Sequence, residues 1–183
     1  MALKGKIGAE TEIQSSASKF FNFFVTQLDE LQNITDEVHE TKLHQGDWHG
    51  VGSHSVKHWN FSSEATVQKF EAKHTPGFVK IHLSRLNFKS MFGGKVVDCK
   101  EHIEEIDNAN KTILYKLFDG EFGEHKYKSG VKLKLKVVEK DEGAIVKWTH
   151  KFEKVHEAIT PPLEQLDSLI KATKEVDAYL LKA

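Results

Sequence analysis

The stretch YKSGVKLKLKVVEKDEGAIVKWTHKFEK, residues 127–154, decides the fold of this chain. In its first part, apolar and polar side chains alternate with a period of two, which predicts a long antiparallel strand with one buried and one solvated face. A turn at 141–143 leads to a partner strand with the same alternation. The positions expected to face inward are Tyr127, Ser129, Val131, Leu133, Leu135, Val137, Val146, Trp148, His150 and Phe152, and those expected to face solvent include Lys126, Lys128, Lys132, Lys134 and Lys136.

Strand patterns continue upstream of this hairpin. Residues 6–14 alternate like a strand with one buried face, and residues 96–106 and 112–119 are predicted to be two further strands. Between Val38 and Phe61 we expect two strands joined by the glycine-rich turn 46–52, because three glycines in seven residues allow positive φ angles and a close approach of the backbone.

Two regions show the period of a helix. After Ser15 and Ser16, either of which can cap a helix, phenylalanines and leucines recur every three or four residues and predict a helical pair or a kinked helix. Near the other end, Thr160 can cap a long helix whose apolar stripe runs to the C-terminus. The economical packing is an α+β fold in which a curved antiparallel sheet wraps around this terminal helix. The stripe consists of Leu166, Leu169, Ile170, Thr173, Val176 and Leu180.

Length and composition limit the class of protein. The 183 residues suit one domain, 1–183, with a sizeable core, and the net charge of −1 gives no broad field to attract nucleic acid or an anionic membrane. No stretch approaches a membrane span or a signal peptide, and the single cysteine, Cys99, fits a reducing compartment. We therefore expect a cytosolic protein that is a monomer or a weak homodimer. With 12 phenylalanines against three tyrosines, its interior should be rich in phenylalanine.

In the order of these elements and in several short sequence motifs, the chain resembles the plant major latex protein family, within the superfamily of the birch pollen allergen (Bet v 1-like) and START-like proteins. The resemblance implies a helix-grip fold with about seven strands, two short helices near the N-terminus and an internal hydrophobic cavity. It also implies binding of steroids, flavonoids, alkaloids or hormones and a link to plant defence or stress, and a few such relatives are enzymes that act within the cavity. The motifs are KGK (4–6), KFFN (19–22), GDW (46–48), GS (52–53), WN (59–60), YKS (127–129), VKWT (146–149), FEK (152–154) and DAYLLKA (177–183).

One departure from the family is an insertion at about 62–92, where related sequences pass through a short turn. Residues 79–83 within it alternate like a short strand, and residues 72–92 contain basic side chains but no Asp or Glu. One interpretation is that the segment is a mobile surface loop or an extra hairpin at the edge of the sheet. A lid over the cavity or a basic docking patch is the other.

The same resemblance assigns a cavity wall to inward positions of the sheet and of the terminal helix. Tyr115 and Tyr127 would add hydroxyls suited to orienting an apolar ligand, although simple wall packing is an equal alternative. The remaining wall positions are Phe24, Phe61, Ile113, Leu117, Val146, Trp148, Leu166, Ile170 and Thr173.

His102 and His150 are the weak candidates for catalysis. His150 alternates with Trp148 and Phe152, and the family alignment puts His102 on the cavity side as well. A neutral imidazole can orient a ligand oxygen or move a proton, and a histidine that is simply buried in the core is the alternative.

No metal site and no cofactor is expected. Five histidines fall between 39 and 58, but a spacing of five on a strand reverses the side chain each time, so they cannot all converge on one ion. The glycine-rich turn lacks the ending of a phosphate loop. The resemblance to the family implies a carrier, buffer or sensor for a hydrophobic plant metabolite, and the alternative is a cofactor-independent isomerase or cyclase of specialised, possibly alkaloid, metabolism.

Overall fold

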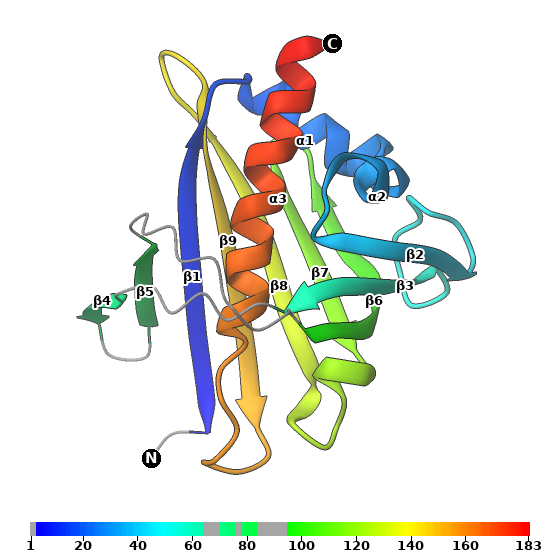
Figure 1. Cartoon of the computed structure of the whole chain (residues 1–183), viewed down its shortest axis with the longest axis vertical. Helices are drawn as coiled ribbons and strands as arrows, with labels where there is room; N and C mark the ends of the chain where they lie inside the picture. The colour runs from blue at the N-terminus through cyan, green and yellow to red at the C-terminus, as the bar shows by residue number, and fades with distance from the viewer. Residues whose placement is uncertain (1–2, 64–69, 76–77, 84–94) are drawn as a thin grey trace.

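The computed structural model describes residues 3–63, 70–75, 78–83 and 95–183. Seven antiparallel strands form one sheet in the order β2-β3-β6-β7-β8-β9-β1, and the sheet curves around the long helix α3 (Figure 1). This arrangement confirms the predicted fold class. The strands are β1 (Lys4–Ile13), β2 (Val38–Gln45), β3 (Val56–Ser63), β6 (Lys95–Asp107), β7 (Thr112–Phe118), β8 (Tyr127–Glu139) and β9 (Ala144–Lys154).

Two further strands extend the sheet beyond β1. β4 (Phe70–Thr75) and β5 (Phe78–Leu83) form an antiparallel hairpin, and β5 pairs in parallel with β1 at Ile7 and Gly8. The insertion expected at 62–92 therefore contributes an edge hairpin, and β5 includes the alternating residues 79–83. Of its basic residues, Arg85 and Lys89 lie outside the described residues, so the lid and the docking patch stay predictions.

The N-terminal helical region folds against the inner face of the sheet. It contains α1 (Ala17–Thr26), a 3₁₀ turn (Leu28–Glu30) and α2 (Leu31–Ile34), which matches the predicted helical pair. Ser16 caps α1 by accepting a hydrogen bond from the backbone N–H of Lys19. The phenylalanines at 20, 21, 23 and 24 are buried, so this region holds the phenylalanine-rich interior expected from composition.

The terminal helix α3 (Leu163–Lys182) lies across the hollow of the sheet (Figure 1). Its N-cap residue is Pro162, and no side chain caps it, so the predicted cap at Thr160 is wrong. The chain is still non-helical at Thr160, whose carbonyl accepts a hydrogen bond from the Tyr127 hydroxyl. Near the other end, Asp177 accepts bonds from the backbone N–H groups of Gln14 and Ser15 and from the Ser15 hydroxyl, which fastens α3 to the junction of β1 and α1.

The start of β8 departs from the predicted alternation. Between Tyr127 and Val131 the pairing with β9 shifts register, with φ of 59° at Ser129 and 74° at Gly130. Ser129 is consequently exposed, which corrects its predicted inward position. A Cβ on Gly130 would lie 2.2 Å from the carbonyl oxygen of Leu117, so this irregularity requires glycine.

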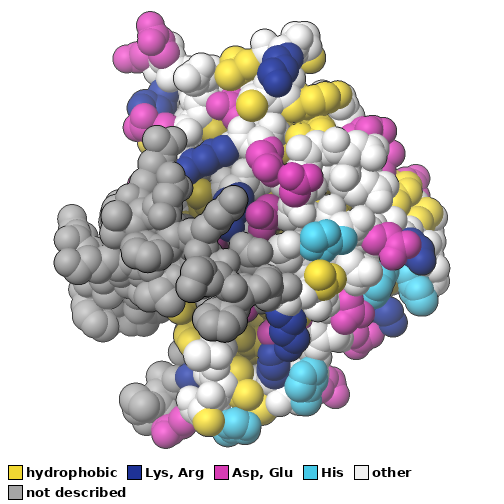
Figure 2. Space-filling view, viewed as in Figure 1, with side chains coloured by type: hydrophobic (Ala, Val, Ile, Leu, Met, Phe, Trp, Pro, Cys, Tyr) yellow, Lys and Arg dark blue, Asp and Glu magenta, His cyan; other side chains and the backbone are white. Residues whose placement is uncertain are grey.

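The surface carries both signs of charge. Figure 2 shows Lys and Asp or Glu side chains interspersed over the face that holds α3, in keeping with the near-zero net charge. Within the described ranges, none of the helices is both long enough and apolar enough to cross a membrane.

Candidate functional site

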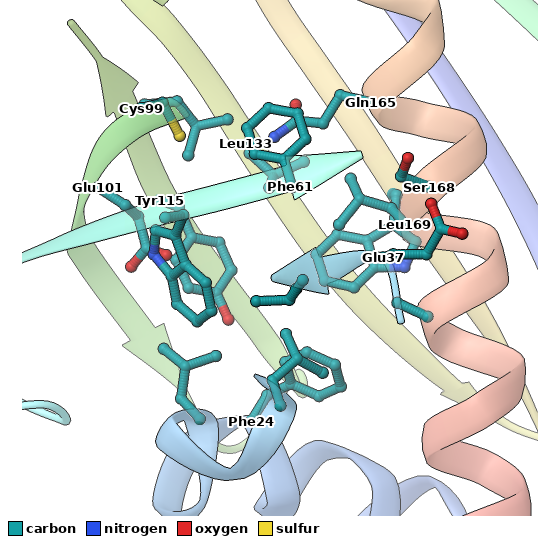
Figure 3. A pocket seen from close by; sticks show the side chains of 17 residues that line it. Phe24, Glu37, Phe61, Cys99, Glu101, Tyr115, Leu133, Gln165, Ser168 and Leu169 are labelled. Carbon is teal, nitrogen blue, oxygen red and sulfur yellow. The ribbon is translucent and has the colours of Figure 1, made fainter. Parts of the chain in front are cut away.

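An internal cavity lies between α3, the N-terminal helices and the inner face of the sheet (Figure 3). The cavity has a volume of about 90 Å³. The cavity is therefore narrow. Its lining is Phe24, Leu28, Leu31, Glu37, Val38, Trp59, Phe61, Cys99, Glu101, Tyr115, Leu117, Leu133, Trp148, Gln165, Ser168, Leu169 and Ala172.

Five of the predicted wall residues line this cavity: Phe24, Phe61, Tyr115, Leu117 and Trp148. They come from α1 and three strands, and each is at most 7% exposed. The alternation of buried positions along each strand explains why one face of the sheet supplies this wall. The structure thus brings together aromatic groups that are far apart in the sequence.

Other predicted residues are buried but lie behind the cavity surface. Ile113, Val146, Leu166 and Ile170 belong to the hydrophobic core and are not among the lining residues. Thr173 is also fully buried, and its hydroxyl accepts a hydrogen bond of 2.8 Å from the Trp148 indole. Thr173 therefore holds a wall residue in place and does not itself face the cavity.

Tyr127 has a structural partner. Its hydroxyl donates to the Thr160 carbonyl at 2.8 Å, and its ring packs edge-on against Phe152. Burial raises its pKa. The hydroxyl that was expected to orient a ligand instead ties β8 to the segment before α3.

His102 lies on the outer face of the sheet, which corrects its predicted position. Along β6, Cys99, Glu101 and Ile103 are buried, so the period of two turns the His102 side chain outward. Its ring contacts Phe118 in an outer groove that also contains Lys100 and Lys116. Partial burial lowers its pKa. His102 does not reach the internal cavity.

The His150 side chain points inward as predicted, but it does not line the cavity. It is fully buried, and its Nε2 is hydrogen-bonded to the side-chain oxygen of Gln165, which lines the cavity. Burial lowers the pKa of His150 to about 4, so its imidazole is neutral at pH 7. The two histidines proposed for proton transfer therefore lie on opposite faces of the sheet.

A buried polar cluster at one end of the cavity was not predicted from the sequence. Lys57 and Glu101 are directly opposite each other on β3 and β6, with 3.2 Å between Lys57 Nζ and Glu101 Oε1. Burial raises the pKa of the Glu101 carboxyl, while Lys57 and the nearby indole N–H of Trp59 oppose that shift. The signal was present, because Lys57 shares the inward phase of Trp59, and Glu101 shares that of Cys99.

A second polar group, also not predicted, lies at the opposite side of the cavity. Glu37 precedes β2, and its carboxylate is 3.8 Å from Lys171 on α3. Burial raises the pKa of the Glu37 carboxyl, and the charge of Lys171 opposes that shift. Ser168, one turn before Lys171 on α3, donates its hydroxyl hydrogen to the Ser62 carbonyl. Figure 3 shows Glu37 and Ser168 facing Glu101 and Tyr115 across the cavity.

Three histidines of the cluster at 39–58 have separate partners. His39 contacts the Ser62 hydroxyl, His49 lies 3.5 Å from Asp29, and His58 lies 2.9 Å from Asp98. Among the described residues, no three His, Cys, Asp or Glu side chains converge as metal ligands would. The glycine-rich turn joins β2 to β3, and Gly52 donates its backbone N–H to the Ile103 carbonyl.

Comparisons with known proteins agree with this architecture. The sequence model of the pathogenesis-related protein Bet v 1 family matches residues 2–76 and 80–183. MLP-like protein 43 of Arabidopsis thaliana is 27% identical over 98% of this chain and 95% of its own length. Major latex protein 149 of Papaver somniferum is 25% identical over 97% of this chain and 92% of its own length.

Solved structures show the same similarity. Ginseng major latex-like protein 151 from Panax ginseng has a TM-score of 0.74 and 25% identity, covering 98% of this chain and 99% of its own. A norcoclaurine synthase from Thalictrum flavum, solved with dopamine and hydroxybenzaldehyde, has a TM-score of 0.64 at 16% identity, covering 98% of this chain and 87% of its own. At that identity the likeness concerns the fold alone.

Proposed function

Because the chain belongs to the pathogenesis-related Bet v 1 family, we propose that it is a binding protein for a hydrophobic plant metabolite, such as a steroid, flavonoid, alkaloid or hormone. The observation that carries the proposal is the narrow cavity between α3 and the sheet, whose lining is mainly apolar and aromatic. The proposed setting is the cytosol, where the chain would act as carrier, buffer or sensor in defence or stress responses.

The energetics of the cavity support binding. Apolar surface removed from water contributes about 25 cal/mol per Å², so a ligand that fills the cavity gains affinity from contact area before any polar contact. Aromatic groups such as Phe24 and Trp148, which meet edge-on at 5.6 Å between ring centroids, form a pre-packed wall. A wall that is already ordered costs little entropy on binding.

The alternative, a cavity enzyme, has less support from the geometry. Of the residues proposed for proton transfer, His102 faces the outside of the sheet and His150 is covered by Gln165. The norcoclaurine synthase of the same fold was solved in complex with dopamine and hydroxybenzaldehyde, so that protein holds small aromatic molecules. We therefore base the proposed function on binding.

A matched pair of helix variants tests it. Ala172 lines the cavity and is 7% exposed, whereas Ala178 lies on the exposed side of the same helix. Ala172→Phe should fill the cavity and abolish binding of an environment-sensitive apolar dye, while Ala178→Phe should bind it like wild type, at one per chain. Circular dichroism checks that both variants fold. Equal dye binding by the two variants would overturn the proposal.

A further inference from the structure

The inner end of the cavity contains polar atoms that lack hydrogen-bond partners. Tyr115 is 3% exposed and Glu101 is 5% exposed, and both line the cavity. Within the described residues, the Tyr115 hydroxyl has no hydrogen-bond partner, and Glu101 Oε1 has Lys57 Nζ at 3.2 Å as its ion-pair partner but no hydrogen bond of normal geometry. An unsatisfied buried polar atom costs about 1–3 kcal/mol, so such atoms beside a cavity point to a bound molecule that completes them.

The opposite end of the cavity repeats this arrangement. Glu37 Oε2 is buried and also lacks a hydrogen-bond partner among the described residues. The neighbouring Ser168 has used its own hydrogen to reach the Ser62 carbonyl, so its oxygen is an acceptor toward the cavity. Between the two ends the lining is apolar, with residues such as Leu117, Leu133 and Phe61.

Each carboxylate has a lysine as its ion-pair partner. Glu101 faces Lys57 at 3.2 Å, and Glu37 faces Lys171 at 3.8 Å, where Lys171 also lies 3.5 Å from Asp167. Neither lysine belongs to the described lining, so the cavity presents carboxylate oxygens to a ligand while the countercharges stand behind them. At the buried Glu101 end a cationic ligand would add a second positive charge to the pair, whereas a neutral hydroxyl can donate to the carboxylate without disturbing it.

On these grounds we propose that the ligand is a neutral, narrow, apolar molecule with a hydroxyl group at each end. One hydroxyl donates to Glu101 and accepts from the Tyr115 hydroxyl, and the other donates to Glu37. The inference rests on the proposed function, because it names the class of molecule that the same cavity holds.

Linear alkane diols with both terminal carbons hydroxylated, and their dimethyl ethers, are suitable probes. The ether keeps the apolar chain and the oxygen atoms but cannot donate a hydrogen bond. A series of increasing chain length should compete with the apolar dye on wild-type protein. At the best length we expect the diol to compete at about a hundredfold lower concentration than its dimethyl ether, since each of the two lost hydrogen bonds, at about 1.4 kcal/mol, changes affinity tenfold. The monomethyl ether should fall between the two.

Two tyrosine variants provide the matched control. Tyr115→Phe removes the hydroxyl that donates to the ligand oxygen, so the diol and its ether, whose oxygen also accepts, should both compete several-fold less well with the dye. Tyr127→Phe removes a hydroxyl that is already bonded to Thr160 outside the cavity and should leave the competition by both ligands unchanged. Each ligand is measured against dye binding to the same variant, so a modest loss of stability does not alter the comparison.

The outcomes separate the inference from the proposed function. Equal competition by diol and ether on wild type, or unchanged competition by both ligands in Tyr115→Phe, would overturn the two-hydroxyl ligand while apolar binding stands. Failure of the dye to bind wild type at all would overturn the proposed function, and the inference with it.

Discussion

The indole N–H of Trp148 on β9 donates a hydrogen bond of 2.8 Å to the hydroxyl of Thr173 on α3. Both residues are buried, and Thr173 in turn donates to the Leu169 carbonyl one turn earlier in the helix. The bond fixes the orientation of a cavity-wall aromatic group and joins helix to sheet. The orientation of the Trp148 ring in the cavity wall and the attachment of α3 to the sheet therefore both depend on this hydrogen bond.

Replacing Thr173 by Val should destabilise the protein. The substitution keeps the shape of the side chain but leaves the buried indole N–H without an acceptor, which costs about 1–3 kcal/mol. Urea unfolding of Thr173→Val, Trp148→Phe and the double variant forms a cycle, and we expect a coupling energy of about 1 kcal/mol. A Thr173→Val stability equal to wild type would show that the hydrogen bond contributes nothing.

Asp177 should be a strong determinant of stability. Its carboxylate accepts three hydrogen bonds, from the N–H groups of Gln14 and Ser15 and from the Ser15 hydroxyl, at 3.0, 2.9 and 2.6 Å. Removing a carboxylate that satisfies buried donors costs about 1.5–3 kcal/mol, so Asp177→Ala should lower the free energy of unfolding by that amount. Lys174→Ala, on the exposed side of α3, is the control and should change it by less than about 0.5 kcal/mol.

The buried pair of Lys57 and Glu101 should show strong non-additivity. Lys57 is fully buried, so Lys57→Met leaves an uncompensated carboxylate and should cost about 3–5 kcal/mol. Combining it with Glu101→Leu should recover most of that loss, because two apolar side chains can replace a buried ion pair at little cost. Denaturant unfolding at pH 7 measures each variant. A double variant as unstable as the sum of the two single variants would contradict a direct pairing.

His150 should make stability depend on pH. Its pKa is about 4 in the folded protein, against about 6.5 in an unfolded chain. The unfolded chain therefore binds the proton more readily, and the stability present at neutral pH is lost as the pH falls from 6.5 toward 4. Between pH 7 and pH 5 the expected loss from this residue is about 2 kcal/mol.

His150→Gln removes that titration and tests its size. The variant should lose less free energy of unfolding between pH 7 and pH 5 than wild type, with urea as denaturant at each pH. His125→Gln, at an exposed position, should follow the wild-type profile. If His150→Gln shows the same pH dependence as wild type, the buried imidazole is not the group that titrates.

Much of the fold followed from alternation along the strands. Five lysines opposite a row of apolar residues located β8, and His150, buried between Trp148 and Phe152 in the same phase of β9, was correctly placed inward. The edge hairpin was one of two interpretations that the sequence left open. The alternation within a segment indicates a strand, but it does not say which other strand that segment pairs with. The irregularity at Ser129 escaped detection because a register shift is set by the neighbouring strand, Leu117 included.

The cavity was predicted less completely than the fold. Position on an inward face does not distinguish a residue that touches the cavity from one packed behind it, which is why Ile113 and Leu166 were expected at the surface of the cavity. Charge was the second obstacle. Glu101 has the inward phase of Cys99 and Ile103, but its pairing with Lys57 on a strand far away in the sequence cannot be read from either strand alone.

Native mass spectrometry of the protein produced in its own cells tests the central claim most directly. We predict that wild type and Ala178→Phe retain one apolar small molecule per chain and that Ala172→Phe, whose cavity is filled, retains none. Equal retention by Ala172→Phe, or a wild-type chain that stays unliganded even after incubation with steroids, flavonoids and alkaloids, would contradict it.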